Sequence, residues 1–499
     1  MLKIKNIQIL PFGISLFFLV VYIFLPTSNS SIDSWAYALY IKQAKDLFLP
    51  HHLLNGAMGL LWVKFVGIFI KADVLRSMLI INALFATAIL YILGITLKEL
   101  GVEVKKVAIW VAFVGSSWAI MRYATENEVY IFPIFFSLLG SYFFIKAKHN
   151  QKFWFVFLSG LFAAFACLFH QIMFFWWLAL LIGIAYRRCF RSFMGFAIPA
   201  LIVPIAYLLV LVLYYNQPCT LNVFIHFVFN DYYSGAAGIS TGLSSFLLLI
   251  IGIARSFLQI HGYIINLNQF SVLFVLGGLI SILFFAWSLA NIKKVQWKWV
   301  NIKSQIVWVH LLAILLQLFF ALLSSGNAEF MVMIPLLLSV VLSQIMKNEI
   351  KFIGLITFAM FVWNLSFGLI PLKIYNLDNN RAIAAQVIKH QKESNQPLYV
   401  LFNRPRVENE VEYSLGFCPQ NLITGIQYEA IDIIKERIDS ALLKGVLVYT
   451  DCVNRPKTLS RETLTITNTF EEQFSEYTFK KADSINTLTG KYYLYVMSR

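Results

Sequence analysis

The chain has 499 residues, of which 59% are hydrophobic and 13% are charged, and its formal net charge is +15. Soluble domains carry about 25% charged residues, so this composition excludes an ordinary soluble protein and predicts a polytopic membrane protein. Residues 376–499 carry 15 basic and 15 acidic residues, so the excess positive charge lies before them. Because that excess sits in short loops between apolar segments, it fits the positive-inside rule, and no nucleic-acid partner is expected.

Apolar stretches of membrane-spanning length recur up to residue 372. The first follows Lys3 and Lys5, but it is longer than the apolar core of a signal peptide and lacks a small-residue cleavage site. We therefore interpret it as an uncleaved helix. The predicted fold class is mainly α, a membrane helical bundle with about eleven spans near residues 7–25, 77–97, 107–122, 129–146, 153–169, 172–187, 193–215, 270–290, 305–323, 330–346 and 352–371.

Every second connection between these segments is rich in Lys and Arg. This alternation predicts a cytoplasmic N-terminus and an extracytoplasmic tail. The chain shows no endoplasmic-reticulum retention signal, which favours a bacterial inner membrane. Most of the ten acidic residues before residue 376 fall in the other, outer connections, so we expect chemistry on the outer face. Seven acidic residues lie in the outer connections, namely Asp33, Asp46, Asp73, Glu126, Glu128, Asp231 and Glu329.

The first long outer loop, residues 26–76, predicts a helix that lies at the membrane interface. Apolar residues recur at helical spacing over Asp33–Phe48, with polar residues on the other faces, and Pro50-His51-His52 is expected to end this helix. The apolar stretch 53–70 is interpreted as a shallow or re-entrant segment, because a full span there would break the charge alternation.

The second long outer loop, residues 216–269, contains a similar apolar run at 246–260. The tail, residues 376–499, predicts a small extracytoplasmic α/β domain. Its sequence contains no glycine-rich phosphate loop, metal triad or nucleophile elbow. Helices are expected at 381–392 and 428–443, and strands at 398–402, 446–450 and 492–496.

Asp33 is the leading candidate for chemistry. A carboxylate at a membrane edge is costly and needs a reason. Lys42, Lys45, His51 and His52 follow it, and such cations beside a carboxylate equip the loop to handle a phosphate-bearing lipid. The alternative is that Asp33 only caps the interfacial helix, because Asp is favoured at that position.

Short polar turns on the same predicted face supply the other candidate substrate-binding residues. Two glutamates beside an arginine are unusual for a plain connection, and a His-Gln pair interrupts an apolar hairpin. Structural alternatives stay open: a solvated turn, a buried polar pair, a carboxylate that complements a helix dipole, or an arginine that snorkels to the interface. The candidates are Arg122, Glu126, Glu128, His170, Gln171, Arg255, Asn327 and Glu329, with His261 near Arg255.

Four of these features, in this order, resemble the GT-C glycosyltransferases, above all the protein O-mannosyltransferase and aminoarabinose-transferase type. They are an Asp soon after the first helix (Asp33), a Pro-His element (Pro50-His51-His52), a Glu-Val-Tyr turn (Glu128-Val129-Tyr130) and a Gly-Asn-x-Glu-Phe turn (Gly326–Phe330). The resemblance covers residues 1–372, the predicted transmembrane domain.

The resemblance implies an integral-membrane enzyme that transfers a sugar from a polyprenyl-phosphate donor to a hydroxyl or amine of a protein, lipid or glycan acceptor. It implies that Asp33 is the general base of an inverting reaction and that nearby cations stabilise the departing phosphate. Members of the family often carry two adjacent acids in this loop, whereas Ser34 follows Asp33 here. No metal site is therefore assigned, no cofactor is expected, and dependence on a divalent metal stays open.

Two alternative functions remain at this stage. A lipid or polysaccharide transporter of the cell envelope, such as a flippase, would show internal repeats and ionisable residues near the bilayer midplane. A non-catalytic membrane scaffold would bind a partner through its tail, but this function leaves the acidic outer turns unexplained.

Overall fold

The computed structural model describes residues 2–150, 152–235, 237–240, 242–260, 271–298, 301, 303–393, 396–401, 404–425, 431–454, 470 and 472–499. The chain divides into two compact units. The helical unit comprises Met1–Pro26, Asp46–Gln259 and Leu276–Leu369, and the α/β unit comprises Thr27–Lys45, Ile260–Val275 and Ile370–Arg499. The segment Thr27–Lys45 thus groups with the tail, whereas the sequence analysis assigned it to the transmembrane domain.

Each of the eleven predicted spans coincides with helix in the structure. The corresponding helices are α1 (Leu2–Phe24), α4 (Val74–Glu99), α5 (Val104–Ser116) with α6 (Trp118–Ala124), α7 (Ile131–Asn150), α8 (Phe153–Phe169), α9 (Phe174–Ala185), α10 (Phe190–Ala197) with α11 (Ile202–Leu209), α15 (Val272–Asn291), α16 (Gln305–Leu323), α17 (Ile334–Ile345) and α18 (Ile350–Asn364).

By length and apolar composition, seven helices of the described chain qualify as membrane spans, or eight when α5 and α6, which meet at a bend of 63°, count as one. The protein is therefore a multi-pass, mainly helical membrane protein, as predicted. The count of eleven spans is not confirmed, because α8, the segment Gln171–Ala185 and the stretch Leu10–Phe24 of α1 are apolar but short. The bend lies at Ser117, whose extended backbone interrupts the helix.

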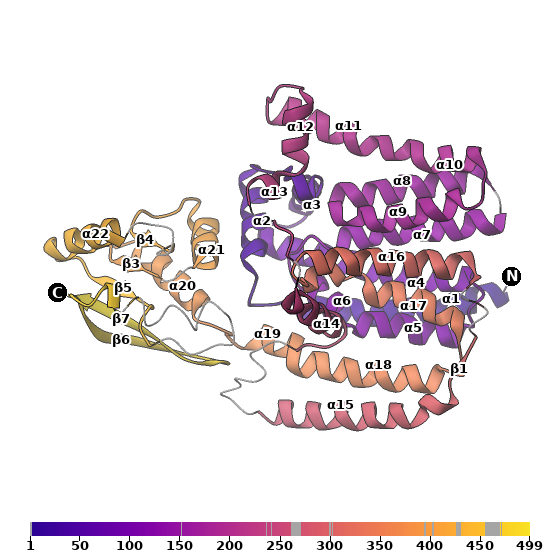
Figure 1. The fold of residues 1–499 in the computed structure, drawn as a ribbon. Helices are drawn as coiled ribbons and strands as arrows, with labels where there is room; N and C mark the ends of the chain where they lie inside the picture. The colour runs from indigo at the N-terminus through magenta and orange to yellow at the C-terminus, as the bar shows by residue number, and fades with distance from the viewer. Residues whose placement is uncertain are drawn as a thin grey trace. The chain divides into compact units, whose positions relative to one another are not determined.

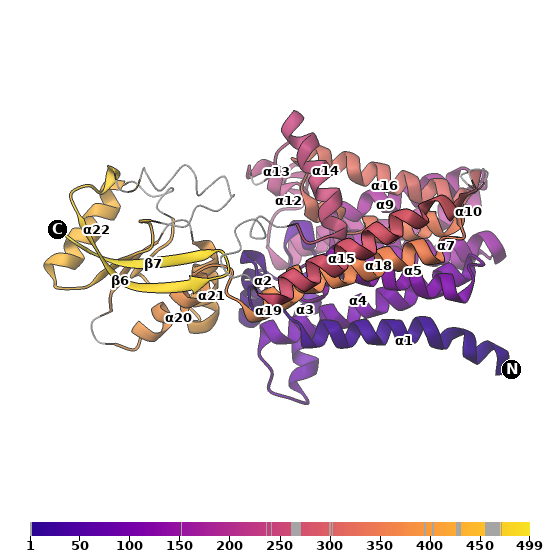
Figure 2. The same ribbon diagram turned by 90° about the horizontal axis from the view of Figure 1, so that it is seen from below.

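Small residues let the helices of this unit approach closely. Helices α7, α8, α9 and α16 run side by side in Figure 1, and the Ser159 hydroxyl of α8 donates a hydrogen bond of 2.8 Å to the Gly140 carbonyl of α7. In Figure 2, α15 lies along α18, where the Phe284 and Phe358 rings are 4.5 Å apart. Close backbone approach and interhelical hydrogen bonds are the usual means of packing helices in lipid.

The first long loop differs from its prediction. Its helix α2 (Ile32–Gln43) is shorter than expected, because Ala44 adopts a left-handed backbone with φ of 51°. Pro50–His52 therefore does not end this helix. It forms a separate 3-10 turn, η1 (Pro50–His52), which leads into helix α3 (Asn55–Gly67) over the segment predicted to be shallow or re-entrant.

The second long loop is mostly helical. It contains α12 (Leu221–Val228), α13 (Asn230–Tyr233) and α14 (Leu243–Phe257), the last over the predicted apolar run. Helix α14 packs against the turn around Gly326, which has a φ of +69°. A Cβ atom at Gly326 would lie 2.5 Å from the Leu249 nitrogen, so both the backbone conformation and the close approach require glycine.

The tail forms a five-stranded mixed sheet in the order β4-β3-β5-β7-β6. β3 is parallel to β4 and β5, whereas β5 and β6 are both antiparallel to β7. The strands are β3 (Leu398–Val400), β4 (Leu422–Ile423), β5 (Val448–Thr450), β6 (Thr478–Thr487) and β7 (Gly490–Ser498), and the helices are α20 (Asn380–His390), α21 (Pro405–Leu415) and α22 (Ile431–Leu443).

The predicted α/β fold of the tail is thus confirmed, with three of its strands in the expected places. Residues 402 and 428–430 of the predicted elements lie outside the described residues. β4, β6 and α21 were not predicted. β6 escaped detection because Lys480 and Lys481 interrupt its pattern, as is common for an edge strand.

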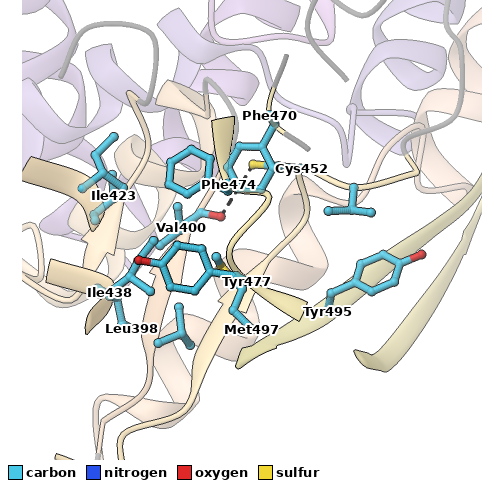
Figure 3. Packing of buried hydrophobic residues seen from close by; sticks show 13 residues of the cluster. Leu398, Val400, Ile423, Ile438, Cys452, Phe470, Phe474, Tyr477, Tyr495 and Met497 are labelled. Carbon is cyan, nitrogen blue, oxygen red and sulfur yellow. Dashed lines mark hydrogen bonds between the residues drawn. The ribbon is translucent and has the colours of Figure 1, made fainter. Parts of the chain in front are cut away.

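The core of this sheet is well filled. Figure 3 shows Phe470, Phe474 and Tyr477 packed over Val400 and the neighbouring strands. Val400 is fully buried, because short parallel strands between two neighbours are covered on both faces.

Candidate active site

Asp33 lies in the first turn of α2, but it does not cap this helix. The N-cap is Ser31, whose hydroxyl accepts a hydrogen bond of 3.0 Å from the Ser34 N–H. The Asp33 side chain is exposed. A carboxylate in the first turn still complements the helix dipole, but the capping role that competed with catalysis belongs to another residue.

The lysines of α2 and its end belong to the same α/β unit as Asp33. The Lys42 ammonium donates a hydrogen bond to the Tyr413 carbonyl, and it lies 4.5 Å from the centroid of the Tyr413 ring. Lys42 is therefore engaged by α21, whereas Lys45 is exposed just after the helix. The remaining candidate residues lie in the helical unit.

A hydrogen bond joins two turns that are far apart in sequence. The Tyr130 hydroxyl, which follows the acidic turn, donates to Glu329 Oε2 over 3.0 Å. Asn327 caps the 3-10 helix η8 (Ala328–Met331) by accepting from the Glu329 N–H at 3.0 Å. Two of the four motifs behind the family resemblance thus meet in one place.

The acidic turn is shaped by a buried ion pair. Arg122 Nη2 lies 2.8 Å from Glu126 Oε2, and the Glu126 side chain is fully buried. Asn82 donates from its side-chain amide to the carbonyls of Glu126 and Glu128, at 2.6 and 3.1 Å. This geometry favours a structural role for Glu126, whose carboxylate faces Arg122.

Four charged candidates interact electrostatically with Tyr123. The charges of Glu128, Glu329, Arg122 and Arg255 all act on its hydroxyl, although they come from three separate segments. The Tyr123 ring lies 4.8 Å from that of Tyr130, between their centroids. His261, the predicted neighbour of Arg255, lies outside the described residues.

Three histidine rings form a continuous row in which each ring meets the next edge to face. The ring centroids of His51 and His52 are 4.1 Å apart, and those of His52 and His170 are 4.4 Å apart. Burial lowers the pKa of His170 to about 3 and also lowers the pKa of His52. Both are therefore neutral at pH 7. The ring centroids of Tyr130 and His170 lie 5.3 Å apart, so the row of rings continues to the acidic turn.

Gln171 holds the Pro-His turn in place. Its side-chain amide donates to the carbonyls of Pro50 and Val228 and to the Tyr207 hydroxyl, at 3.2, 2.8 and 3.0 Å. The Tyr207 hydroxyl donates to the same Pro50 carbonyl over 2.5 Å. Gln171 therefore positions η1, and its amide nitrogen is occupied within the protein.

Asp231 is a functional candidate that the sequence analysis did not select. Its Oδ2 lies 3.2 Å from His51 Nδ1, and the nearby imidazole lowers the pKa of the Asp231 carboxyl. The available signal was its membership of the outer acidic set. The pair lines a cavity of about 280 Å³ with mixed walls, whose polar lining also includes His170, Asn230, Ser324 and Asn327; it is called the polar cavity below.

A second cavity, of about 570 Å³, adjoins this polar cavity and is almost entirely apolar. It is lined by side chains such as Phe174, Trp177 and Val203. The two cavities share wall residues, which are Gln171, Ile172, Val228, Phe229, Tyr232 and Phe320. A polar chamber joined to an apolar one suits an amphipathic ligand.

Within the described part of the chain, no group of three or more His, Cys, Asp or Glu side chains is placed to hold a metal ion. We therefore assign no metal ligands. The chemistry that this arrangement can support is proton transfer by carboxylate and binding of an anion by imidazole and amide groups.

Solved structures that are similar to this one include an ArnT protein and an oligosaccharyltransferase. The crystal structure of ArnT from Cupriavidus metallidurans in the apo state aligns with 99% of this chain and 98% of that chain, with a TM-score of 0.48 and 12% identity. The crystal structure of an Archaeoglobus fulgidus oligosaccharyltransferase aligns with 89% of this chain and 68% of that chain, with a TM-score of 0.50 and 12% identity.

The second similarity shows that the chain has the fold of that oligosaccharyltransferase, the GT-C fold that the motifs predicted. At such low identity a shared fold does not by itself establish an activity. No protein-family model matches the chain, and no curated protein matches it in sequence.

Proposed function

We propose that the protein is an integral-membrane glycosyltransferase that transfers a sugar from a polyprenyl-phosphate donor to a hydroxyl or amine of an acceptor. The observation that carries this proposal is the polar cavity with its His51–Asp231 pair beside a larger apolar cavity. A prenyl phosphate has this same division, an anionic head on an apolar chain. The fold and the order of the four motifs agree with this substrate class.

In the proposed reaction, Asp33 removes the proton from the acceptor hydroxyl or amine as that atom attacks the anomeric carbon. The bond between the anomeric carbon and the phosphate oxygen breaks, and the sugar configuration inverts. The leaving group is the polyprenyl phosphate. One positioned carboxylate contributes a factor of about 10² to 10⁴ to such a step.

The negative charge that develops on the phosphate needs fixed donors. His51 is suited to this role, because its imidazole lines the cavity and its Nδ1 lies 3.2 Å from Asp231 Oδ2. Asn230 and Asn327 line the same cavity and can donate from their side-chain amides. Glu128, Glu329 and Arg255, which all interact electrostatically with Tyr123, are proposed to position the sugar or the acceptor.

The proposed location is a bacterial inner membrane, with the active site and the tail on the extracytoplasmic face and the N-terminus in the cytoplasm. The alternation of basic loops supports this orientation. A reporter fused after Arg499 tests it: activity on the extracytoplasmic side is expected, and a cytoplasmic signal would contradict the whole topology.

The central experiment uses a deletion strain whose lipids and glycans are profiled against the parent strain. The product that is missing names the acceptor and the sugar. Wild-type protein should restore this product, and Asp33→Asn should not, at equal membrane expression. Asp432→Asn is the matched control, because Asp432 also lies in the first turn of a helix of the α/β unit. Full product formation by Asp33→Asn would refute the proposal.

A further inference from the structure

Helix α2 is too short to hold its own position. It has 12 residues, and isolated helices of this length are marginal in water. A general base must be held within a fraction of an ångström of its productive geometry. Asp33 can therefore act only if other elements fix α2, and the described contacts within the α/β unit identify those elements.

Helix α21 of the tail contacts α2 along its whole length. At the start of α2, the Asn409 side-chain amide donates to the Ile32 carbonyl over 3.2 Å, next to Asp33. One turn further along α2, the ring centroids of Trp35 and Tyr413 lie 5.2 Å apart. At the end, Lys42 donates to the Tyr413 carbonyl and lies over its ring.

The segment that precedes α2 is fixed to the same unit. Asn29 is buried, and its amide nitrogen donates to the carbonyls of Leu372 and Tyr375, both at 2.8 Å. Its oxygen accepts from the Leu377 N–H at 3.0 Å. The entry to α2 and both of its ends are therefore bound to residues of the tail.

We propose that Asn409 and Tyr413 are positioning residues for the acceptor-activating carboxylate of Asp33, and that Lys42 belongs to this clamp instead of binding the donor phosphate. The C-terminal domain then positions the proposed catalytic base through contacts within its own unit. This inference depends on the proposed function, because it presumes that Asp33 is the base.

The test separates turnover from donor binding. Full-length variants are compared in two assays: product formation in the complemented deletion strain, and binding of undecaprenyl phosphate by purified protein in nanodiscs. Lys42→Ala, Asn409→Ala and Tyr413→Ala are expected to lower product formation at least tenfold and to leave undecaprenyl phosphate binding within twofold of wild type. Tyr413→Phe, which keeps the ring, is expected to form product at the wild-type level, in contrast to Tyr413→Ala.

Hydrogen exchange of residues 32–43 reports on the clamp directly. Faster exchange is expected in the three alanine variants. Tyr413 is buried, and its removal could unfold the domain, so the exposed Lys42 provides the variant in which folding is not at issue. Lys481→Ala is the matched control, because Lys481 makes a cation–π contact with Tyr493, 3.8 Å from the ring centroid, elsewhere in the same domain.

Each outcome decides something. Tenfold weaker undecaprenyl phosphate binding by Lys42→Ala would overturn the proposal and make Lys42 a phosphate ligand. Wild-type product formation and exchange in all clamp variants, with Asp33→Asn inactive, would overturn the clamp and leave the proposed function standing. Activity of Asp33→Asn would instead overturn the proposed function itself.

Discussion

In the helical unit, the polar candidates Glu126, Glu128 and His170 are buried, and several candidates are bound to one another, whereas in the α/β unit Asp33 is exposed on the first turn of its helix. Arg122 and Glu126 form an ion pair, Tyr130 donates a hydrogen bond to Glu329, and three histidine rings pack edge to face. Buried polar groups must find partners inside the protein, so these residues build the fold as well as the cavity.

This difference predicts that substitutions in the helical unit lower stability and activity together, whereas Asp33 affects activity alone. The strongest test is Arg122→Ala, which leaves the Glu126 carboxylate buried without its partner cation. We expect a loss of about 3–5 kcal/mol of unfolding free energy, measured as a lower Tm in detergent. The double variant Arg122→Ala with Glu126→Gln should recover part of this loss. An unchanged Tm in Arg122→Ala would remove the structural role assigned to the pair.

Acid should destabilise the folded protein through the buried histidines His52 and His170. The pKa of His170 is lowered to about 3 and that of His52 is also lowered, whereas an unfolded histidine titrates near pH 6.5. As the pH falls below about 6.5, the unfolded chain binds protons that the folded protein cannot, and stability is lost down to the folded pKa. The expected slope is up to about 1.4 kcal/mol per pH unit for each histidine.

Thermal melts between pH 7.5 and pH 5 measure this slope. His170→Gln should give a shallower dependence, because the variant has no group at this position that titrates in this range. Equal slopes in wild type and variant would show that His170 is not the source of the acid sensitivity.

The His51–Asp231 pair can be tested by its effect on donor binding. If His51 binds the donor phosphate, His51→Ala should weaken undecaprenyl phosphate binding about tenfold, equivalent to about 1.4 kcal/mol. Asp231→Asn should weaken it less, because the imidazole remains but loses its carboxylate. His226→Ala is a suitable control, since that imidazole stacks on Tyr233 and does not line the polar cavity. Unchanged binding by His51→Ala would exclude this phosphate site.

The bond between the two distant turns should be worth less than the ion pair. Tyr130→Phe removes the donor to Glu329 and keeps the ring, so we expect a loss of about 1 kcal/mol in stability. Product formation is expected to fall by more than this loss of stability explains, because Glu329 loses its orientation. A normal rate in Tyr130→Phe would mean that this bond does not position a working carboxylate.

Asp33→Asn should have the smallest effect on stability. The side chain is exposed and Ser31 supplies the cap, so the change in unfolding free energy should stay within about 0.5 kcal/mol. The same variant should lose transfer activity. A large drop in its Tm would erase the contrast between the two units.

Much of the helical unit could be predicted from sequence, because apolar length and loop charge are local properties that the bilayer selects. The end of α2 could not. The apolar spacing continues to Phe48, but Ala44 turns left-handed at φ of 51° and stops the helix at Gln43. Nothing in the sequence marks this position, because alanine is a strong helix former.

The membrane class, the positions of the long apolar helices and the set of polar residues from which an active site can be built follow from the sequence alone. The partners of these residues depend on tertiary packing. In the fold, Glu126 pairs with Arg122, Asp231 lies beside His51, and Lys42 binds Tyr413 of the tail. The physical reason is that hydrophobicity and charge act along the chain, whereas the partner of a polar side chain depends on which distant segments the packing brings within about 3 Å.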